Sequence, residues 1–532
     1  MQGRPTTLAT DGMVASPHYL ASMAGVQVLR SGGNALDAAI ATNAVLTVVY
    51  PHMCAIGGDA FMLIWDPKEE RLVGLNGAGR SASRASIEAL RRMGLTVMPE
   101  RGAHAVTVPG AIHAWQTAHS RFGSRSFGSL FESAIHYASS GFPVSASVSA
   151  SIAANQPLLE RQAAAAKQFL PNGVAPRPGT VLRFPDLADS YRQIAEHGVD
   201  AFYGGPLGEA IAATVQVDGG LLSAEDVARH QSRWVDPLST NYRGHDLFEL
   251  PPPTQGVVSL QLANVAEGYD IANLGRNSAE QIHRLVEAKK LAFTDRDRYV
   301  TDPEFSDIPV KRLISKEHAA AQRARIDAYR AVVDEPDRPG LGDTIYLCVV
   351  DRDGLCVSLI QSIFNSFGSG LVAGGTGIVL HNRGASFTLE PGAANRLEPN
   401  KQPMHTLIPA MLMQDGSPEV VLGTMGAHGQ AQTHIQLLCN LVDFELEPQA
   451  AIESPRWVSG RGVAGDPPHV LYLEEPIGTE VLERLRSMGH EARLTQPFSS
   501  LMGHAHMIRI DRERGILMGA SDPRSDGAAL GW

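Results

Sequence analysis

The tripeptide Gly342-Asp343-Thr344 places a hydroxyl at the start of a β-rich segment. The residues after Asp343 predict a β-hairpin, because two β-rich runs flank the turn 351–354, Asp-Arg-Asp-Gly. If the chain were cut before Thr344, the new α-amine would stand beside the hydroxyl, and one residue would supply both nucleophile and general base. That amine has a reference pKa of about 7.7–8.0, which suits proton transfer near neutral pH. Taken alone, such a tripeptide is usually a turn followed by a strand.

The elements that must position this threonine alternate between helical and β-rich patterns. Ser16-Pro17 predicts the start of a helix that ends near Ser31, and residues 34–49 predict a second, buried helix. Further segments are expected as strands at 60–65 and 242–250, as mostly helical structure over 86–230, and as helices at 278–298 and from about 315. The Pro-rich stretch 335–340 predicts an exposed tail just before Thr344. This mixture indicates an α/β or α+β layered fold.

The composition excludes several classes of function. With 532 residues, 44% of them hydrophobic, the chain can bury a large core, and its formal charge of −11 argues against a nucleic-acid partner. The first residues lack an apolar core of signal-peptide length, and the most apolar stretch, 38–50, is too short to span a bilayer. We therefore expect a cytoplasmic protein without a membrane partner. A Cys348–Cys356 disulfide is disfavoured in that compartment. No zinc-like spacing occurs, and we expect neither metal nor cofactor.

Seven short motifs occur in an order that is far more specific than any one of them. They are Gly-Gly-Asn-Ala-Leu-Asp-Ala-Ala at 32–39, Gly-Gly-Asp-Ala-Phe-Met at 57–62, Val-Pro-Gly at 108–110, Phe-Tyr-Gly-Gly at 202–205, Pro-Pro-Thr-Gln-Gly at 252–256, Glu-Ala-Lys-Lys-Leu-Ala-Phe at 287–293 and Gly-Ala-Ser-Asp-Pro-Arg at 519–524. Together with the segment 342–387, they resemble the gamma-glutamyltransferase (glutathione hydrolase) family.

The resemblance implies an α+β fold, the four-layer αββα sandwich of N-terminal-nucleophile hydrolases. It implies self-cleavage between Asp343 and Thr344, giving a large subunit of residues 1–343 and a small subunit of residues 344–532. The two subunits would form one intertwined body, an αβ heterodimer or possibly (αβ)2.

The resemblance also assigns catalytic roles. Thr344 would be the nucleophile, and Ser362 stands where the family keeps a second hydroxyl that holds the nucleophile's amine. Gly426 and Ala427 stand where two backbone N–H groups form the oxyanion hole. The family usually has glycine at both positions, so Ala427 is a departure, and we expect its donor to survive if φ stays negative there.

A carboxylate on the substrate would be clamped by an arginine, whose planar fork binds carboxylates in a bidentate manner. Arg80 lies in a Gly-Arg-Ser-Ala piece that looks like the acylase-like relatives, and it is our first candidate; Arg84 is the second. His405 and Thr406 stand where relatives carry two serines that touch the carboxylate, although a structural role for His405 is nearly as plausible.

The residues expected to hold a substrate's α-ammonium are missing. Ser386 stands at the family's acidic position, Phe364 replaces an asparagine, and Arg383 adds positive charge. An ammonium without a carboxylate partner in a semi-buried pocket is costly. The loop 393–398 is also shorter than in many relatives, which favours water access and hydrolysis. We therefore expect a small amide whose acyl group carries a carboxylate but no α-amine, of glutaryl or oxamate type.

Two alternatives stay open. One is a gamma-glutamyltransferase or glutathione hydrolase that acts on γ-glutamyl amides. The other is an unprocessed scaffold without catalysis.

Overall fold

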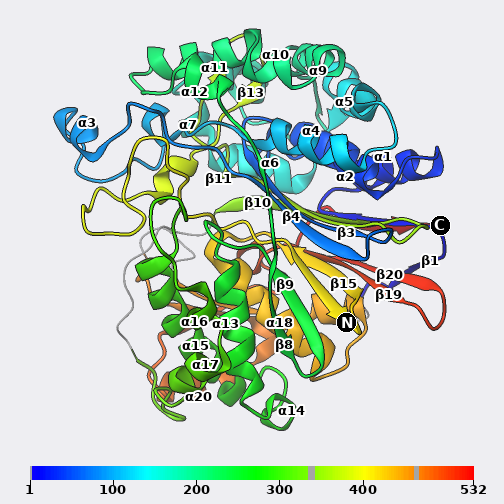
Figure 1. Cartoon of the computed structure of the whole chain (residues 1–532), viewed down its shortest axis with the longest axis vertical. Coiled ribbons are helices and arrows are strands. Elements are labelled where there is room, and N and C mark those ends of the chain that lie inside the picture. The colour runs from blue at the N-terminus through cyan, green and yellow to red at the C-terminus, as the bar shows by residue number, and fades with distance from the viewer. Residues whose placement is uncertain (1–2, 333–341, 461–465) are drawn as a thin grey trace.

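Two seven-stranded antiparallel sheets form the centre of the molecule (Figure 1). The computed structural model describes residues 3–332, 342–460 and 466–532. The first sheet runs in the order β1 (Thr7–Ala9), β20 (Ile516–Ser521), β19 (Ala505–Asp511), β15 (Ser417–Thr424), β14 (Ala410–Gln414), β9 (His245–Glu249) and β8 (Leu238–Tyr242). The second runs in the order β21 (Ala528–Gly531), β2 (Met13–Ser16), β10 (Asp343–Val350), β11 (Cys356–Phe364), β3 (Asp59–Asp66), β4 (Arg71–Gly77) and β7 (Arg233–Val235).

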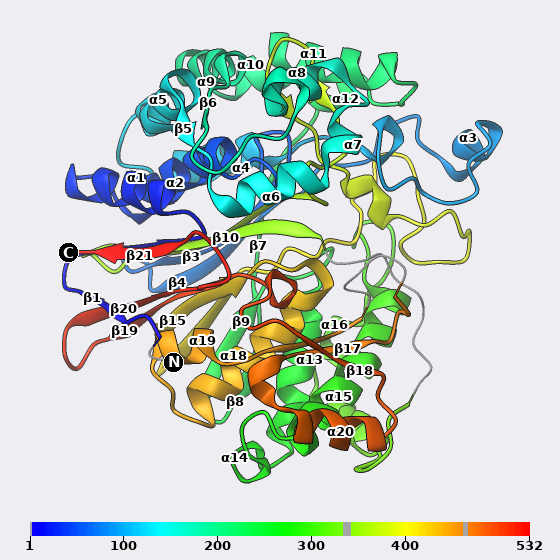
Figure 2. The same cartoon turned by 180° about the vertical axis from the view of Figure 1, so that it is seen from behind.

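The two sheets pack face to face, and helices cover their outer faces (Figures 1 and 2). A dry cluster between the sheets joins Phe61 and Tyr346 of the second sheet to Met411 and Ile508 of the first. The helices beside the second sheet include α1 (Tyr19–Arg30), α2 (Ala35–Val49), α4 (Ala111–Phe122), α5 (Glu132–Ser140), α9 (Pro185–His197) and α11 (Pro206–Val217). Those beside the first sheet include α13 (Gly256–Glu267), α15 (Ala279–Tyr299), α17 (Lys316–Arg323), α18 (Gln430–Val442), α19 (Pro448–Glu453) and α20 (Thr479–Ser487).

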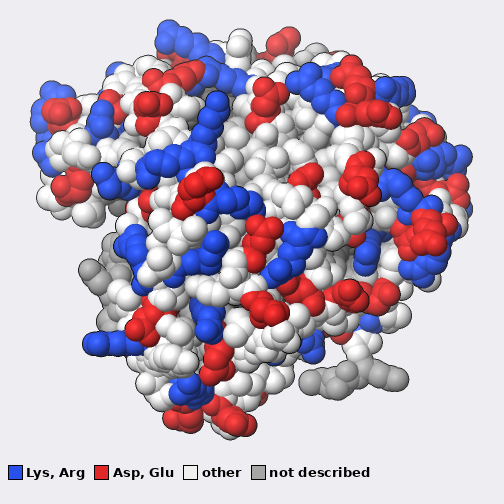
Figure 3. All heavy atoms as spheres, turned by 60° about the horizontal axis from the view of Figure 1, so that its bottom comes forward, with Lys and Arg blue, Asp and Glu red and all other residues white. Residues whose placement is uncertain are grey.

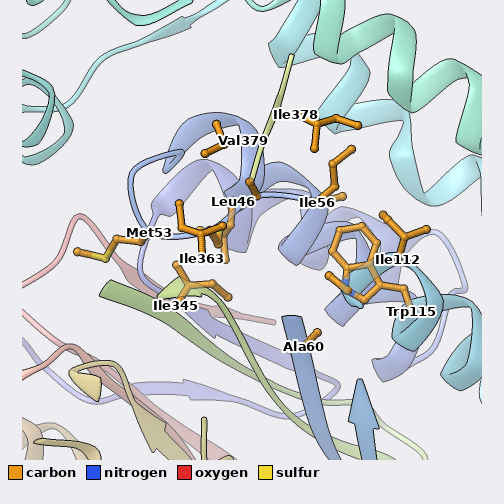
Figure 4. Packing of buried hydrophobic residues seen from close by; sticks show 14 of the residues in the cluster. Leu46, Met53, Ile56, Ala60, Ile112, Trp115, Ile345, Ile363, Ile378 and Val379 are labelled. Carbon is orange, nitrogen blue, oxygen red and sulfur yellow. The ribbon is translucent and has the colours of Figure 1, made fainter. Parts of the chain in front are cut away.

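The largest core cluster fills the space between α2 and the second sheet. Every residue of α2 is buried, as expected for a helix that is apolar on most faces. Figure 4 shows Leu46 of α2 among Ile345 of β10 and Ile363 of β11, with Trp115 of α4 at one side. The core therefore packs directly against the hairpin that carries Thr344.

Most of the predicted elements are confirmed. The hairpin is β10 and β11, Asn34 caps α2 with Asp37 completing a capping box, and Ser278 caps α15. The predicted strand at 242–250 is the second half of another hairpin, β8 and β9. Mixed helices and antiparallel sheets confirm the α+β class.

Two boundaries were wrong. The first helix is capped by His18, whose Nδ1 accepts from the N–H of Leu20, and Ser16 is instead the last residue of β2. The Ser16 hydroxyl bonds Ser22 and the His18 carbonyl, so it serves the strand–helix junction rather than the cap. The helical stretch expected from about residue 315 toward the Pro-rich tail is a short helix that ends at Arg323. The predicted tail 335–340 lies outside the described residues.

The four cysteines form no disulfide, and the charged side chains on the face shown in Figure 3 are mixed in sign. All four cysteines are buried and free, and Cys348 pairs with Ser358 across the hairpin rather than with Cys356. Acidic and basic side chains are interspersed on the face shown in Figure 3. Among the described residues, no helix is long and apolar enough to cross a bilayer.

Candidate active site

The hydroxyl of Ser362 connects the groups around the Asp343–Thr344 peptide bond. Thr344 Oγ1 donates to Ser362 Oγ at 3.2 Å, and Ser362 Oγ donates to the carbonyl oxygen of Asp343 at 2.6 Å. The N–H of Phe364 donates to the same Oγ at 2.7 Å, which fixes its orientation. One hydroxyl thus contacts the candidate nucleophile and the carbonyl that this nucleophile would attack.

The strand register creates this contact. The β10–β11 ladder shifts between Asp343 and Ile345, which brings Thr344 beside Ser362 near the end of the sheet. Phe364 closes the ladder with φ of +75°, a conformation that is uncommon for an aromatic residue. A side chain at Gly58 would come within 2.3 Å of the Ser362 carbonyl, so only glycine lets β3 approach here.

The Asp343 carboxyl lies next to the candidate nucleophile, where burial disfavours its charged form. Burial raises the pKa of its carboxyl to about 6, although a hydrogen bond from Ser366 and the charge of Arg101 act in the opposite direction. Arg101 is held nearby, since its guanidinium donates to the carbonyls of Ser366 and Gly368. The sequence did not single out Arg101.

The predicted oxyanion loop lies between β15 and α18. Among the described residues, no hydrogen bond uses the N–H of Gly426 or Ala427, so neither donor is committed to another group there. Ala427 has φ of +43°, so the condition of a negative φ, under which its donor was expected to survive, is not met. An alanine in this left-handed region costs roughly 1–2 kcal/mol relative to ordinary backbone. The loop needs outside support to keep this shape.

A pocket of about 190 Å³ opens beside this loop and the hairpin. Two of its walls are Phe364, which packs on Gly342, and His428, which follows Ala427. Ser386 also lines it, and its hydroxyl has no hydrogen-bond partner among the described residues. The rest of its lining is Arg296, Asp297, Val300, Thr388, Ala393, Asn395 and Met404.

Arg383 lies directly behind the Phe364 ring, with its guanidinium carbon 4.1 Å from the ring centroid. It is 1% exposed and donates through Nη1 to Thr406 Oγ1 at 3.1 Å. Its Nη2 has no hydrogen-bond partner, and no carboxylate of the described residues forms an ion pair with it. Burial lowers its pKa to about 9, with Asp59 acting against the shift, so the side chain stays charged at neutral pH.

His405 belongs to a buried network beneath the pocket rather than to its lining. Its Nε2 lies 3.1 Å from Asp59 Oδ2, and burial lowers its pKa to about 3. Asp59 also accepts from the N–H groups of Gly79 and Gly110 through Oδ1. His405 is fully buried, which favours its structural role. The hydroxyl oxygen of Thr406 accepts the hydrogen bond from Arg383.

The two arginines favoured from the sequence lie elsewhere. Arg80 is paired with Asp302 at 2.9 Å and Glu304 at 2.7 Å, and it lines a separate pocket of about 130 Å³. Arg84 is exposed and donates weakly to the Leu221 carbonyl at 3.4 Å. Their role as carboxylate ligands stays a prediction, but Arg80 already has two carboxylate partners.

Besides Arg101, three more site residues escaped sequence reasoning. Asp59 and Gln255 belong to quoted motifs, and Arg296 follows another by three positions, yet no spacing assigns them a role. Gln255 bonds the carbonyl of Ala427, Arg296 bonds His428, and Asp59 anchors His405. Each acts through a neighbour that is distant in sequence, and only the fold brings these pairs together.

Comparison with known proteins places this site in a class. Residues 21–532 match the family described as gamma-glutamyltranspeptidase. The chain is 41% identical to a glutathione hydrolase-like proenzyme, YwrD, of Bacillus subtilis and 38% identical to an oxamate amidohydrolase proenzyme of Klebsiella pneumoniae, over 99% of each chain in both cases. A crystal structure of cephalosporin acylase from Bacillus halodurans superimposes with a TM-score of 0.93 at 36% identity, covering 100% of this chain and 98% of that one.

These likenesses define an enzyme that hydrolyses amides or transfers their acyl groups. The chain belongs to the gamma-glutamyltranspeptidase family.

The raised pKa of Asp343 predicts a pH-dependent stability. The carboxyl binds its proton more tightly in the folded chain, at about pH 6, than in the unfolded chain, at about 3.9. Its favourable contribution is therefore present below about pH 4 and is lost as pH rises to about 6. We expect the thermal midpoint of Thr344→Ala to fall over this window relative to that of Asp343→Asn/Thr344→Ala. Scanning calorimetry at one scan rate from pH 4 to 7 measures this, and a constant offset between the two variants would contradict it.

Proposed function

We propose that the chain is a self-processing amide hydrolase whose nucleophile is Thr344 at a newly formed N-terminus. Residues 1–343 would form the large subunit and residues 344–532 the small subunit of a four-layer αββα N-terminal-nucleophile hydrolase. The observation that carries this proposal is the Ser362 hydroxyl, which bonds both Thr344 Oγ1 and the Asp343 carbonyl. The proenzyme names of the relatives support it.

Self-cleavage would begin with attack of Thr344 Oγ1 on the Asp343 carbonyl carbon. The Ser362 hydroxyl, donating to that carbonyl at 2.6 Å, would stabilise the oxyanion as it forms. The C–N bond then breaks as the proton lost by the Thr344 hydroxyl is delivered to the amide nitrogen, which leaves Asp343 as an ester on Thr344 Oγ1 and gives Thr344 a free α-amine. Water hydrolyses the ester, and the products are the Asp343 carboxylate and a free Thr344 hydroxyl.

In turnover the α-amine of Thr344 would take the proton of its own hydroxyl, which attacks the substrate amide. The N–H groups of Gly426 and Ala427 would receive the oxyanion, and Ser362 would hold the amine. The amine product leaves with a proton, and water releases the acyl group as an acid. No metal or cofactor is needed for these steps.

The acyl group is proposed to carry a carboxylate, and Arg383 is proposed as its main ligand. A buried guanidinium with an unused Nη2 and no ion-paired carboxylate is unfavourable by itself, and a substrate carboxylate would relieve this. Phe364 covers Arg383 while Gly342 packs on Phe364. Loss of that contact after cleavage would let the ring move and open the guanidinium to the pocket.

A γ-glutamyl substrate is the second candidate. Asp297 lines the pocket and is the acidic residue that could face an α-ammonium, but it is paired with Arg296 at 2.8 Å. Some relatives are named as glutathione hydrolases or glutathione hydrolase-like proteins, which supports this second candidate.

Removal of the Ser362 hydroxyl tests the self-cleavage step. We expect Ser362→Ala to slow cleavage by about 10²–10³-fold, the usual loss for one oxyanion donor. Ser358→Ala is the matched control, because Ser358 is buried four residues earlier on the same strand and bonds the Ala410 carbonyl. A time course of intact masses after expression measures both variants. Cleavage of Ser362→Ala at the rate of the control would rule out this role.

Substrate preference tests the role of Arg383. We expect a glutaryl anilide to be hydrolysed with higher kcat/KM than its γ-glutamyl counterpart, with oxamate as a second acidic substrate. Arg383→Ala should lower kcat/KM for the glutaryl compound about tenfold to a hundredfold, because a hydrogen bond to a charged group is worth about 1.5–3 kcal/mol. A neutral acyl anilide should be much less affected.

Two further variants complete this comparison. Arg80→Ala is the rival assignment, and Arg192→Ala, an exposed arginine paired with Asp189, is the control. If Arg80→Ala alone abolishes the preference for acidic acyl groups, the clamp is Arg80. A clear preference of the wild type for the γ-glutamyl anilide would favour the second candidate.

A further inference from the structure

Two side chains from the first 343 residues brace the oxyanion loop. Gln255 donates through Nε2 to the carbonyl of Ala427 at 2.9 Å and to the carbonyl of Thr406 at 3.1 Å. Its Oε1 accepts from Arg296 Nη1 at 2.9 Å. The same Nη1 lies 2.9 Å from Nδ1 of His428, the residue after Ala427. We refer to Gln255 and Arg296 as the Gln255 brace.

The surroundings leave the Gln255 amide one favourable orientation. Turning it over would point Oε1 at two carbonyl oxygens and the amide N–H groups at the Arg296 guanidinium. Gln255 is fully buried at the start of α13, and its backbone N–H donates to the His405 carbonyl at 2.9 Å. Arg296 is held in turn, because its guanidinium stacks on Phe293 at 4.1 Å and pairs with Asp297.

The loop has a conformation that this brace can maintain. Gly426 has φ of +127°, which suits glycine, whereas Ala427 has φ of +43°, which is unfavourable for a residue with a Cβ. Such conformations persist only where surrounding contacts determine them. The Ala427 carbonyl receives two N–H donors, Gln255 Nε2 and the backbone N–H of Gln430, and these fix the peptide plane after Ala427.

We infer that Gln255, supported by Arg296, is a positioning residue that holds Ala427 in the left-handed conformation. This keeps the N–H groups of Gly426 and Ala427 aimed at the substrate oxyanion. The inference rests on the proposed function, because the loop matters only if an oxyanion forms there. The brace also joins the two proposed subunits, so the large subunit would shape the catalytic loop of the small one after cleavage.

Gln255→Met tests this role, because methionine has a similar length but neither donor nor acceptor. An oxyanion hole acts mainly in the transition state, so we expect kcat to fall about tenfold to a hundredfold while KM stays within about twofold. Gln261→Met is the matched control: Gln261 is buried on the same helix and bonds Asp295. It should retain wild-type kcat.

A double-mutant cycle separates positioning from general stability. Glycine adopts positive φ without penalty, so the loop should depend less on its brace in the Ala427→Gly background. We expect Gln255→Met to lower kcat there by a factor at least about threefold smaller than in the parent. Equal losses in both backgrounds, or an unchanged kcat in Gln255→Met, would overturn the inference.

Two further measurements cover failure of folding and failure of the proposed function. If Gln255→Met does not fold, Gln255→Glu keeps the contact with Arg296 but turns an oxygen toward the Ala427 carbonyl, and the same cycle applies. A crystal structure of the variant shows φ at residue 427 without any assay. Retention of φ near +43° would refute the brace even if the wild type hydrolyses amides. A wild type that hydrolyses none of the tested amides would refute the proposed function, while a changed φ would still support the brace.

Discussion

The hydrogen bonds of the Ser362 hydroxyl are the constraint on which the rest of the site depends. They require Ser362 Oγ, Thr344 Oγ1 and the Asp343 carbonyl to meet at one point of a β-ladder. Three local features accompany that contact: the register shift, the positive φ of Phe364 and the close approach of the backbone at Gly58. The buried helix α2 packs against the same hairpin and keeps it rigid.

The same geometry links processing to specificity. Phe364 bonds Ser362 through its N–H, packs on Gly342 with its ring, and covers Arg383. Under the proposed function, a change at the scissile bond would therefore reach the guanidinium proposed to bind the substrate. Arg383 forms no ion pair with a carboxylate of the described residues, and position 386 is a serine; both features support the proposed acyl group with a carboxylate and no amine. The names of the acylase and oxamate amidohydrolase relatives agree with this chemistry.

Local patterns predicted the hairpin, α2, α15 and the α+β class, because strand alternation, capping and apolar runs act over a few residues. The family resemblance pointed to Ser362, Gly426 and Ala427; the structure places Ser362 in hydrogen-bond contact with Thr344, while the roles of Gly426 and Ala427 stay predictions. It could not give the sign of φ at Ala427, which contacts from Gln255 maintain over 172 positions of sequence. The same limit applies to Arg80: its ion pairs with Asp302 and Glu304, 222 and 224 positions away, could not be predicted from the local sequence pattern.

The central claim is that Thr344 becomes an N-terminal nucleophile. Its most direct test is mass spectrometry of the purified chain after brief incubation with an acidic amide and an acid quench. The account predicts two chains that begin at residues 1 and 344, with the acyl group attached to Thr344 in a fraction of the smaller one. An uncut chain that still hydrolyses the amide, or an acyl group on any other residue, would contradict it.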